Sequence, residues 1–364
     1  MNTAEVLVIG GGIAGISAAA ELARDASVVV LEAEPQIGYH STGRSAAVFI
    51  LNYGNATLRA LNQLALPELS GGLLGDTVLS PRGELLLADE SALAALEAYV
   101  EGSTGLQRLT AGEACALVPV LRRDRIAAAV LEPQALDIDV DRLLQGYARL
   151  LRGRGGRIET GQRVQAIARR GGAWRVETAQ GAFEAPVLVN AAGAWAEVVA
   201  EMAGVARVGL QPLRRSAVMM ALPAEVDSTG WPLFASAADD WYAKPEGARL
   251  MISPADEDPV DPQDAWPDDM VLAEGLDRFS QMVDVPLVRP SHSWAGLRSF
   301  VPDRTPVVGF APEAQGFFWL AGQGGYGVQT APALAAITRR LVAGGGAAVD
   351  AALLAALSPA RFDG

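Results

Sequence analysis

The feature that most constrains the fold is a glycine-rich turn between an apolar strand and a helix near the start of the chain. Residues 6–9 read Val-Leu-Val-Ile, and Gly10, Gly12 and Gly15 follow in the spacing Gly-x-Gly-x-x-Gly. Gly10 permits the tight turn, Gly12 lets the backbone approach a pyrophosphate, and Gly15 lets the helix pack on the strand. The helix N-terminus adds unpaired N–H groups and a positive dipole end. The pattern predicts a βαβ unit that binds a dinucleotide.

A second apolar strand, at residues 28–31, ends at Glu32, where a carboxylate can hold the ribose of an adenosine. The order of strand, helix over residues 13–24, strand and acidic residue is more specific than the glycines alone. The alternative interpretation is a glycine-rich turn in an unrelated α/β fold.

Composition excludes several classes of function. The 364 residues are half hydrophobic, which is enough for a large core and predicts two domains. A net charge of −13 argues against a nucleic-acid or anionic-membrane partner. Cys115 is the only cysteine, and His40 and His292 are the only histidines, so we expect no disulfide framework and no metal site.

The sequence also shows no recognisable targeting signal. No basic segment precedes the first strand, and no apolar run reaches the length of a membrane span. We therefore expect a cytoplasmic protein without a transmembrane span, and peripheral docking at the inner membrane stays open.

Two later strand ends repeat the logic of the first turn. Residues 187–190 form an apolar strand that leads into Ala192 and Gly193, and residues 317–321 lead into Gly324 and Gly325 before a helix at 330–341. Three separated glycine-bearing strand ends fit one long cofactor, which favours FAD over NAD. The intervening periodicity predicts helices at 59–69, 91–99 and 141–152, and strands at 84–88, 157–168, 174–178 and 182–187. Residues 208–294 alternate strand-like segments with prolines and acidic loops, which indicates a separate antiparallel substrate domain.

Five segments together resemble one family. They are the N-terminal fingerprint and residues 40–47, 188–195, 294–303 and 322–330. The chain is similar to the FAD-dependent D-amino acid oxidoreductase family, which includes glycine oxidase and sarcosine oxidase, and most of all to its bacterial D-arginine dehydrogenases. The resemblance implies an α/β fold, with a doubly wound, glutathione-reductase-like Rossmann domain for FAD and an α+β antiparallel-sheet substrate domain. The FAD domain would comprise residues 1–47, 137–207 and 294–364, and the substrate domain residues 48–136 and 208–293.

The same resemblance implies the reaction and the cofactor contacts. Hydride would pass from the Cα of a D-amino acid to flavin N5, and the imino acid would hydrolyse to a 2-oxo acid and ammonia. FAD should be non-covalent because Cys115 is not at the family's C-terminal linking position; a histidyl link at His40 is the remaining alternative. The electron acceptor stays open between a quinone, another carrier and O2. The implied cofactor residues are Gly10, Gly12, Ile13, Ala14, Gly15, Glu32, Ala33, Ser41, Thr42, Arg44, Ser45, Ala46, Val164, Ala192, Gly193, Trp195, Gly325, Tyr326, Gly327, Val328, Gln329 and Thr330.

The substrate's carboxylate needs a fork of donors, which a guanidinium supplies. Arg298 and Arg215 match the family's carboxylate-binding arginines, Tyr53 and Tyr242 are candidate hydroxyl partners, and Gly325 would offer its carbonyl to the amine. Arg214 is the alternative to Arg215, because neighbours on a strand face opposite ways. Arg298 could instead form a structural ion pair, and both tyrosines could be ordinary half-buried aromatics.

Glu84 matches the acidic residue that pairs with the guanidinium in D-arginine dehydrogenase, although it could also be a surface charge at the start of a strand. Val48 and Ile50 stand where those enzymes carry histidine and threonine, which favours less polar substrates. Leu233 and Ala235 are expected on the same wall. The alternatives in function are a flavin oxidase of another amine or a 2-hydroxy acid, and an FAD subunit of a hetero-oligomeric opine- or amine-oxidising complex.

Overall fold

A six-stranded sheet forms the centre of one half of the molecule. The computed structural model describes residues 2–72, 74–345 and 349–362; Met1 and residues 363–364, at the ends of the expected FAD domain, lie outside this range. Five neighbouring strands are parallel and the last is antiparallel. The order is β10 (Arg157–Glu159), β3 (Val28–Leu31), β2 (Val6–Ile9), β14 (Val187–Asn190), β22 (Phe317–Ala321) and β21 (Val307–Phe310).

Helices and a second sheet cover the two faces of this central sheet. Val8, Val30 and Phe318 point to the side where the helices α1 (Ile13–Leu22), α2 (Ala56–Pro67), α5 (Val140–Gly153) and α8 (Gly327–Val342) pack. Leu7, Leu31 and Trp319 point to the other side. That side is covered by α6 (Ala196–Ala203) and by the sheet β1 (Asn2–Thr3), β13 (Gly181–Ala185), β12 (Ala173–Thr178) and β11 (Val164–Arg170). This confirms the expected doubly wound α/β class.

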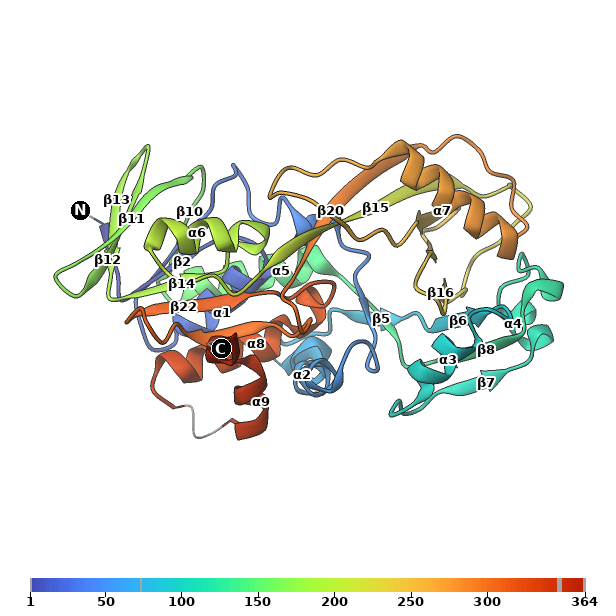
Figure 1. Cartoon of the computed structure of the whole chain (residues 1–364), viewed down its shortest axis with the longest axis horizontal. Coiled ribbons are helices and arrows are strands. Elements are labelled where there is room, and N and C mark those ends of the chain that lie inside the picture. The colour runs from blue at the N-terminus through green and yellow to red at the C-terminus, as the bar shows by residue number, and fades with distance from the viewer. Residues whose placement is uncertain (1, 73, 346–348, 363–364) are drawn as a thin grey trace.

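The other half is built on a nine-stranded sheet. All its neighbouring pairs are antiparallel except β16 with β6, which run parallel. The order is β19 (Asp258–Pro259), β15 (Gln211–Ala221), β18 (Arg249–Ser253), β17 (Tyr242–Pro245), β16 (Leu233–Ser236), β6 (Glu84–Ala88), β8 (Ala128–Glu132) and β7 (Gln107–Leu109), with β20 (His292–Phe300) also paired to β15. In Figure 1 the long strands β15 and β20 run from the central sheet into this half.

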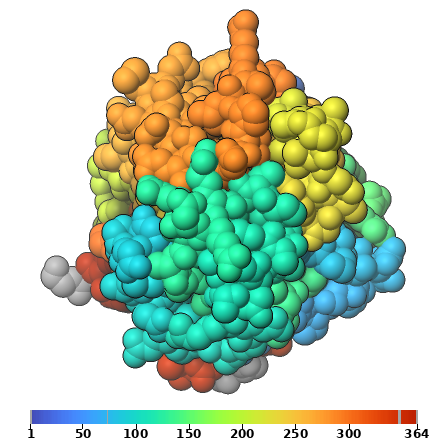
Figure 2. All heavy atoms as spheres, turned by 90° about the vertical axis from the view of Figure 1, so that its right-hand side faces the viewer, coloured from blue at the N-terminus to red at the C-terminus, as the bar shows by residue number. Residues whose placement is uncertain are grey.

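Shorter elements complete both halves. The small sheet β4 (Val48–Phe49), β9 (Leu136–Ile138) and β5 (Leu79–Pro81) packs Phe49 and Ile138 into the core cluster on the helix-covered side of the central sheet. Helix α7 (Asp269–Met282) packs Phe279 against Phe234 and Trp241. Figure 2 shows the teal segments around α3 (Leu93–Val100) and α4 (Ala111–Leu117) at the middle of the outer face, below the orange chain that follows α7. The remaining described elements are α9 (Ala351–Leu357) and the short helices η1 (Ser41–Arg44), η2 (Glu68–Gly72), η3 (Arg123–Arg125), η4 (Gly193–Trp195) and η6 (Pro359–Phe362).

Two local expectations need correction. The predicted strand at 157–168 is two strands, β10 and β11, because the chain turns at Gly161 with φ of +68°. The segment 208–294 holds the fourteen-residue helix α7 besides strands. None of the helices in the described part of the chain combines the length and apolar character that crossing a bilayer requires.

Candidate functional site

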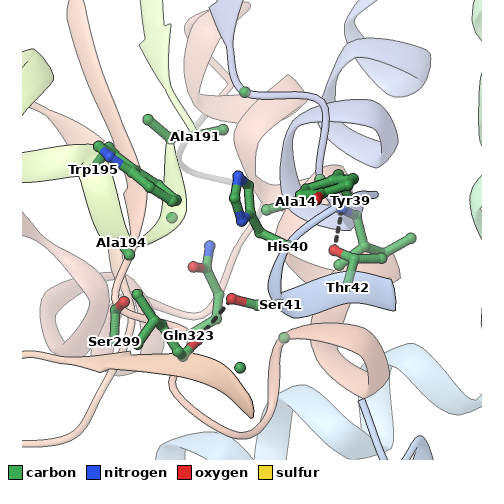
Figure 3. Close-up of a pocket in the computed structure, with 18 of the residues that line it drawn as sticks. Ala14, Tyr39, His40, Ser41, Thr42, Ala191, Ala194, Trp195, Ser299 and Gln323 are labelled. Carbon is green, nitrogen blue, oxygen red and sulfur yellow. Dashed lines mark hydrogen bonds between the residues drawn. The ribbon is translucent and has the colours of Figure 1, made fainter. Parts of the chain in front are cut away.

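A cavity of about 350 Å³ lies at the carboxyl ends of the central strands. Its lining includes residues from all three glycine-bearing segments, among them Gly12, Gly193 and Gly325. The segments are far apart in the sequence, and the parallel order of β2, β14 and β22 brings their ends to one edge of the sheet. Figure 3 shows Ala14, Thr42, Ala191 and Gln323 around this space.

The three fingerprint glycines have different roles. A Cβ at Gly10 would lie 2.3 Å from the Ala191 carbonyl oxygen, and one at Gly15 would lie 1.9 Å from the Gly10 carbonyl oxygen. Both positions therefore exclude a side chain because of packing within the protein. A Cβ at Gly12 would meet only Thr42 Oγ1, at 3.3 Å, so this face of the turn is open toward the cavity.

The N-terminus of α1 is available to an anion. The N-cap residue is Gly12, which has no side chain to bond the free N–H groups, and no acidic residue stands in the first turn of the helix. The Ile13 N–H donates to Thr42 Oγ1 at 3.0 Å, which fixes the η1 segment over the turn (Figure 3). Backbone N–H groups and the helix dipole at such an end favour a pyrophosphate.

Glu32 is held at the other end of the cavity. Its carboxylate accepts from the Gly11 N–H at 2.5 Å and from the Glu34 N–H at 2.8 Å, and it lines the cavity. His40 lies at this end too, with Nε2 3.2 Å from Glu34 and its ring 4.6 Å from the Trp195 ring. This end therefore suits an adenosine.

Most residues expected to hold the cofactor do line the cavity. They are Gly10, Gly12, Ile13, Ala14, Glu32, Ala33, Ser41, Thr42, Arg44, Ser45, Ala46, Val164, Ala192, Gly193, Trp195, Gly325, Gly327 and Val328. Gly15, Tyr326, Gln329 and Thr330 do not. Gly15 packs on Gly10, Gln329 bonds Asn62 at 2.7 Å, and Thr330 bonds the Tyr326 carbonyl at 2.8 Å.

Several lining residues escaped the sequence analysis. Tyr39 adjoins the segment at residues 40–47, and Ser299 and Gln323 stand inside segments that carried the family resemblance, so their positions offered a signal. His40, considered above only as a covalent link, also lines the cavity. No pattern in the sequence marked Gln162 or Arg163 as lining residues. Among the described residues, Gln323 Nε2 is a buried donor without a partner. An orphaned donor in a cavity with an open glycine turn and a helix N-terminus fits a large polar cofactor such as FAD.

Arg298 lies where the cavity meets the substrate half. A Cβ on Gly325 would stand 3.0 Å from Arg298 Nη1, so the guanidinium packs directly on the Gly325 backbone. Nη1 donates to the Tyr53 hydroxyl at 3.4 Å, and no carboxylate of the described residues lies within ion-pair distance. Burial lowers the pKa of Arg298, but Tyr53, Tyr242 and Asp239 raise it more, so the guanidinium stays charged. A desolvated cation with no ion-pair partner is suited to bind an anion.

The second arginine is neutralised by the protein. Arg215 lines the cavity, donates to the Asp256 carbonyl at 2.9 Å and pairs with Glu257 at 3.0 Å. Arg214 is not among the lining residues and pairs with Asp258 at 2.8 Å. The structure thus turns Arg215 and not Arg214 toward the cavity, as alternation along β15 requires.

The sheet register places the remaining candidates on one face. Residues directly opposite on neighbouring strands share a face. Met219, four residues along β15 from Arg215, lies opposite Met251, which lies opposite Lys244, two residues from Tyr242. Tyr242 lies opposite Ala235, and Ala235 opposite Leu86, two residues beyond Glu84. Tyr242 lines the cavity, whereas Tyr53 and Glu84 do not. The face runs from two arginines, over apolar side chains, to the buried Glu84, which lies opposite the buried Glu132.

Asp239 is a charged group that sequence reasoning missed. It stands in the turn between β16 and β17 with a φ of +53°. Burial raises the pKa of its carboxyl, while Arg215 and Arg298 lower it. The charge of Asp239 also raises the pKa of Glu84, so Asp239 influences both ends of the site. No pattern in the sequence marks this residue, because its neighbours come from distant strands.

Comparison with known proteins identifies the class. Residues 5–341 match the model of the DAO family, described as FAD dependent oxidoreductase, and the chain belongs to this family. FAD is therefore its cofactor, and the cavity residues above are those that fit it.

Individual relatives are distant. The chain is 27% identical over 206 residues to the hydrogen cyanide synthase subunit HcnC of Pseudomonas aeruginosa, covering 55% of this chain and 48% of that protein. It is 26% identical over 360 residues to human mitochondrial dimethylglycine dehydrogenase, covering 90% of this chain and 41% of that protein. The chain thus spans about half the length of the curated relatives first matched. Its fold matches glycine oxidase from Geobacillus kaustophilus with a TM-score of 0.85 at 24% identity, covering 99% of each chain.

Proposed function

We propose that this chain oxidises the amine-bearing carbon of an amino acid, with FAD as the electron acceptor within the site. The observation that carries the proposal is Arg298, a desolvated guanidinium packed on Gly325 beside the cofactor cavity and without an ion-pair partner among the described residues. Such a group selects a carboxylate. Dimethylglycine dehydrogenase and glycine oxidase, whose names specify amino-acid amines, add support from the family.

The protein's part in this reaction is to bind and orient the substrate. Arg298 would fix the carboxylate, with Arg215 and Tyr242 beside it, and the Gly325 carbonyl would accept from the amine. Burial raises the pKa of the Tyr53 hydroxyl, so it stays protonated and donates. FAD, when bound, supplies the two-electron acceptor. The imino acid would leave and hydrolyse to a 2-oxo acid and ammonia.

We further propose a D-amino acid of the D-arginine dehydrogenase type as the substrate. The support is the family resemblance together with Glu84, the buried acid at the far end of the site's sheet face. Val48 and Ile50 keep the intervening wall apolar, and Val48 packs in the same cluster as Leu233, Ala235 and Tyr242. We therefore also propose that the enzyme accepts a broad range of apolar D-amino acids.

Anaerobic mixing with D- and L-amino acids and 2-hydroxy acids tests these statements in one experiment. We expect the flavin absorbance band to bleach with D-amino acids, and fastest with those that carry a cationic side chain. Bleaching by 2-hydroxy acids alone would overturn the amine oxidation, and bleaching by L-amino acids would overturn the stereochemistry.

A second candidate is an FAD subunit of a larger amine-oxidising complex. The relative HcnC, described as a subunit of hydrogen cyanide synthase, favours it. This candidate requires that the purified chain fails to turn over with any acceptor, whether O2, a quinone analogue or another carrier, and that activity returns with co-purifying subunits.

A further inference from the structure

Two buried glutamates share one phenol at the far end of the site. Glu84 and Glu132 stand directly opposite each other on β6 and β8, and α3 packs over both strands. The Tyr99 hydroxyl of α3 lies 3.1 Å from Glu84 Oε2 and 3.1 Å from Glu132 Oε2. Glu84 is 7% and Glu132 is 2% exposed, and in the described chain neither makes an ion pair with Arg, Lys or His.

The hydrogen atoms in this cluster can be counted. Glu132 accepts from the Leu51 N–H at 2.9 Å, the Asn52 N–H at 3.4 Å and Asn52 Nδ2 at 2.8 Å, the environment of an ionised carboxylate. Tyr99 has a single hydroxyl hydrogen. If Tyr99 gives it to Glu132, Glu84 can bond to the phenol oxygen only by donating a proton of its own.

Electrostatics agrees with this count. Burial, followed by the charge of Glu132, raises the pKa of Glu84 to about 8, and Asp239 adds to the effect. A hydrogen bond donated by Tyr99 to Glu84 would lower this pKa, and that opposing effect is lost when the Tyr99 hydrogen goes to Glu132. The side chains clustered on this face include Leu86, Leu233 and Ala235 and the ring of Tyr242. In the ligand-free protein at neutral pH, Glu84 is therefore a neutral acid.

We propose that Glu84, Tyr99 and Glu132 form a proton-exchanging receptor for the cationic end of a substrate side chain. This rests on the proposed function, since the substrate's carboxylate would be held at Arg298. A guanidinium or ammonium group binds next to Glu84, the Glu84 O–H bond breaks, and the proton passes to solvent. Each bound cation thus replaces one proton, and the net charge of the cluster is unchanged. Glu132 keeps its three N–H donors, and Tyr99 positions both carboxyl groups.

The proposal fixes how specificity changes with pH. Below pH 8 the proton competes with the cation, so affinity for a cationic side chain should rise about tenfold per pH unit and then level off. The ratio of kcat/KM for D-arginine over D-norleucine isolates this effect, because ionisation of the α-amine and of the shared site cancels. A ratio that stays constant from pH 6 to pH 9 would overturn the proposal.

Three variants locate the effect. In Glu84→Gln the ratio should be low and independent of pH. In Glu132→Gln the charge that disfavours Glu84 ionisation is gone, so the pH at which the ratio levels off should fall by one unit or more. Glu97→Gln, on the same helix as Tyr99 but exposed and paired with Arg108, is the matched control and should leave the profile unchanged. An unmoved profile in folded Glu132→Gln would contradict the shared cluster.

A binding measurement keeps the proposal testable even if Glu132→Gln fails to fold. Deamino-arginine, the arginine skeleton without its α-amino group, cannot be oxidised at Cα. Titrated into the wild-type holoenzyme at pH 7 in weak buffer, it should release nearly one proton per site, whereas a straight-chain carboxylic acid of equal length should release none. Equal release by both would refute the exchange. Because no turnover is involved, this outcome is independent of whether amino acids bleach the flavin.

Discussion

At the scale of single residues, the two arginines of the site differ in whether a carboxylate of the protein balances their charge. Glu257 neutralises Arg215, and Glu257 is itself shared with Arg304 at 2.8 Å. Arg298 meets only a phenol and the backbone of Gly325. The residue with the uncompensated charge should therefore provide most of the attraction for a carboxylate.

We expect Arg298→Met to retain FAD and to lose efficient turnover. An unpaired carboxylate in a desolvated site costs about 3 to 5 kcal/mol, which corresponds to a fall in kcat/KM of roughly a hundredfold to several thousandfold. Steady-state kinetics would measure the loss of turnover, and the flavin spectrum of the purified variant would measure the retained FAD. Unchanged kcat/KM would remove Arg298 from the substrate site.

Arg214 and Arg215 form a matched pair, adjacent in sequence and opposite in orientation. Arg215→Met should lower kcat/KM by at least tenfold because it removes a cavity-lining cation. Arg214→Met removes ion pairs with the half-exposed Asp258 and the buried Asp256, which affects stability, and because Arg214 does not line the cavity it should change kcat/KM only slightly. Equal losses in both variants would show that general damage to β15, and not substrate binding, is being measured.

At the scale of elements, the turn between β2 and α1 separates cofactor binding from folding. Gly12→Ala should destabilise the apoprotein far less than Gly15→Ala, because its methyl group would press only on Thr42 Oγ1 at 3.3 Å, but it should reduce FAD affinity at least tenfold. Gly15→Ala should destabilise the apoprotein itself, since its Cβ would overlap the Gly10 carbonyl. Thermal melting of both apoproteins, followed by FAD titration, distinguishes the two. Tight FAD binding by Gly12→Ala would contradict the pyrophosphate site.

Elements with local signals were predictable from sequence. The strands at Glu84–Ala88 and Val187–Asn190 have the expected bounds, and the helix expected at 141–152 spans Val140–Gly153. The helix α7 was missed because its acidic and apolar residues lie among prolines, although Asp268, which caps it, was a usable signal. The Glu84–Tyr99–Glu132 cluster was beyond prediction, since its contacts depend on the register of β6 with β8 and on where α3 packs.

At the scale of the whole molecule, the two halves meet around the cofactor cavity. Arg44 of the η1 segment donates to the Ala295 carbonyl at 2.9 Å and pairs with Asp264, which ties the glycine-rich half to the substrate half. The division into an FAD domain and a substrate domain along the sequence limits given above stays a proposal. Limited proteolysis of the apoprotein would map it.

Filling this cavity should stabilise the entire chain. At a free FAD concentration of about 100 times Kd, we expect the free energy of unfolding to rise by about 2.7 kcal/mol over that of the apoprotein. Urea denaturation at several FAD concentrations would measure the increase. A midpoint that does not depend on FAD would mean that the unfolded chain binds it equally, or that the cavity is not its site.

The order of strands in the central sheet also has a consequence for biosynthesis. The fingerprint strand β2 is made before the other strands of the central sheet, yet β22 and the Gly324–Gly325 turn that complete the same cavity come more than 300 residues later. A growing chain on the ribosome therefore cannot present a finished flavin site until β22 and the turn after it have emerged. Yellow colour in a preparation would thus report translation through β22, and any fragment that stops before Phe317 should be colourless.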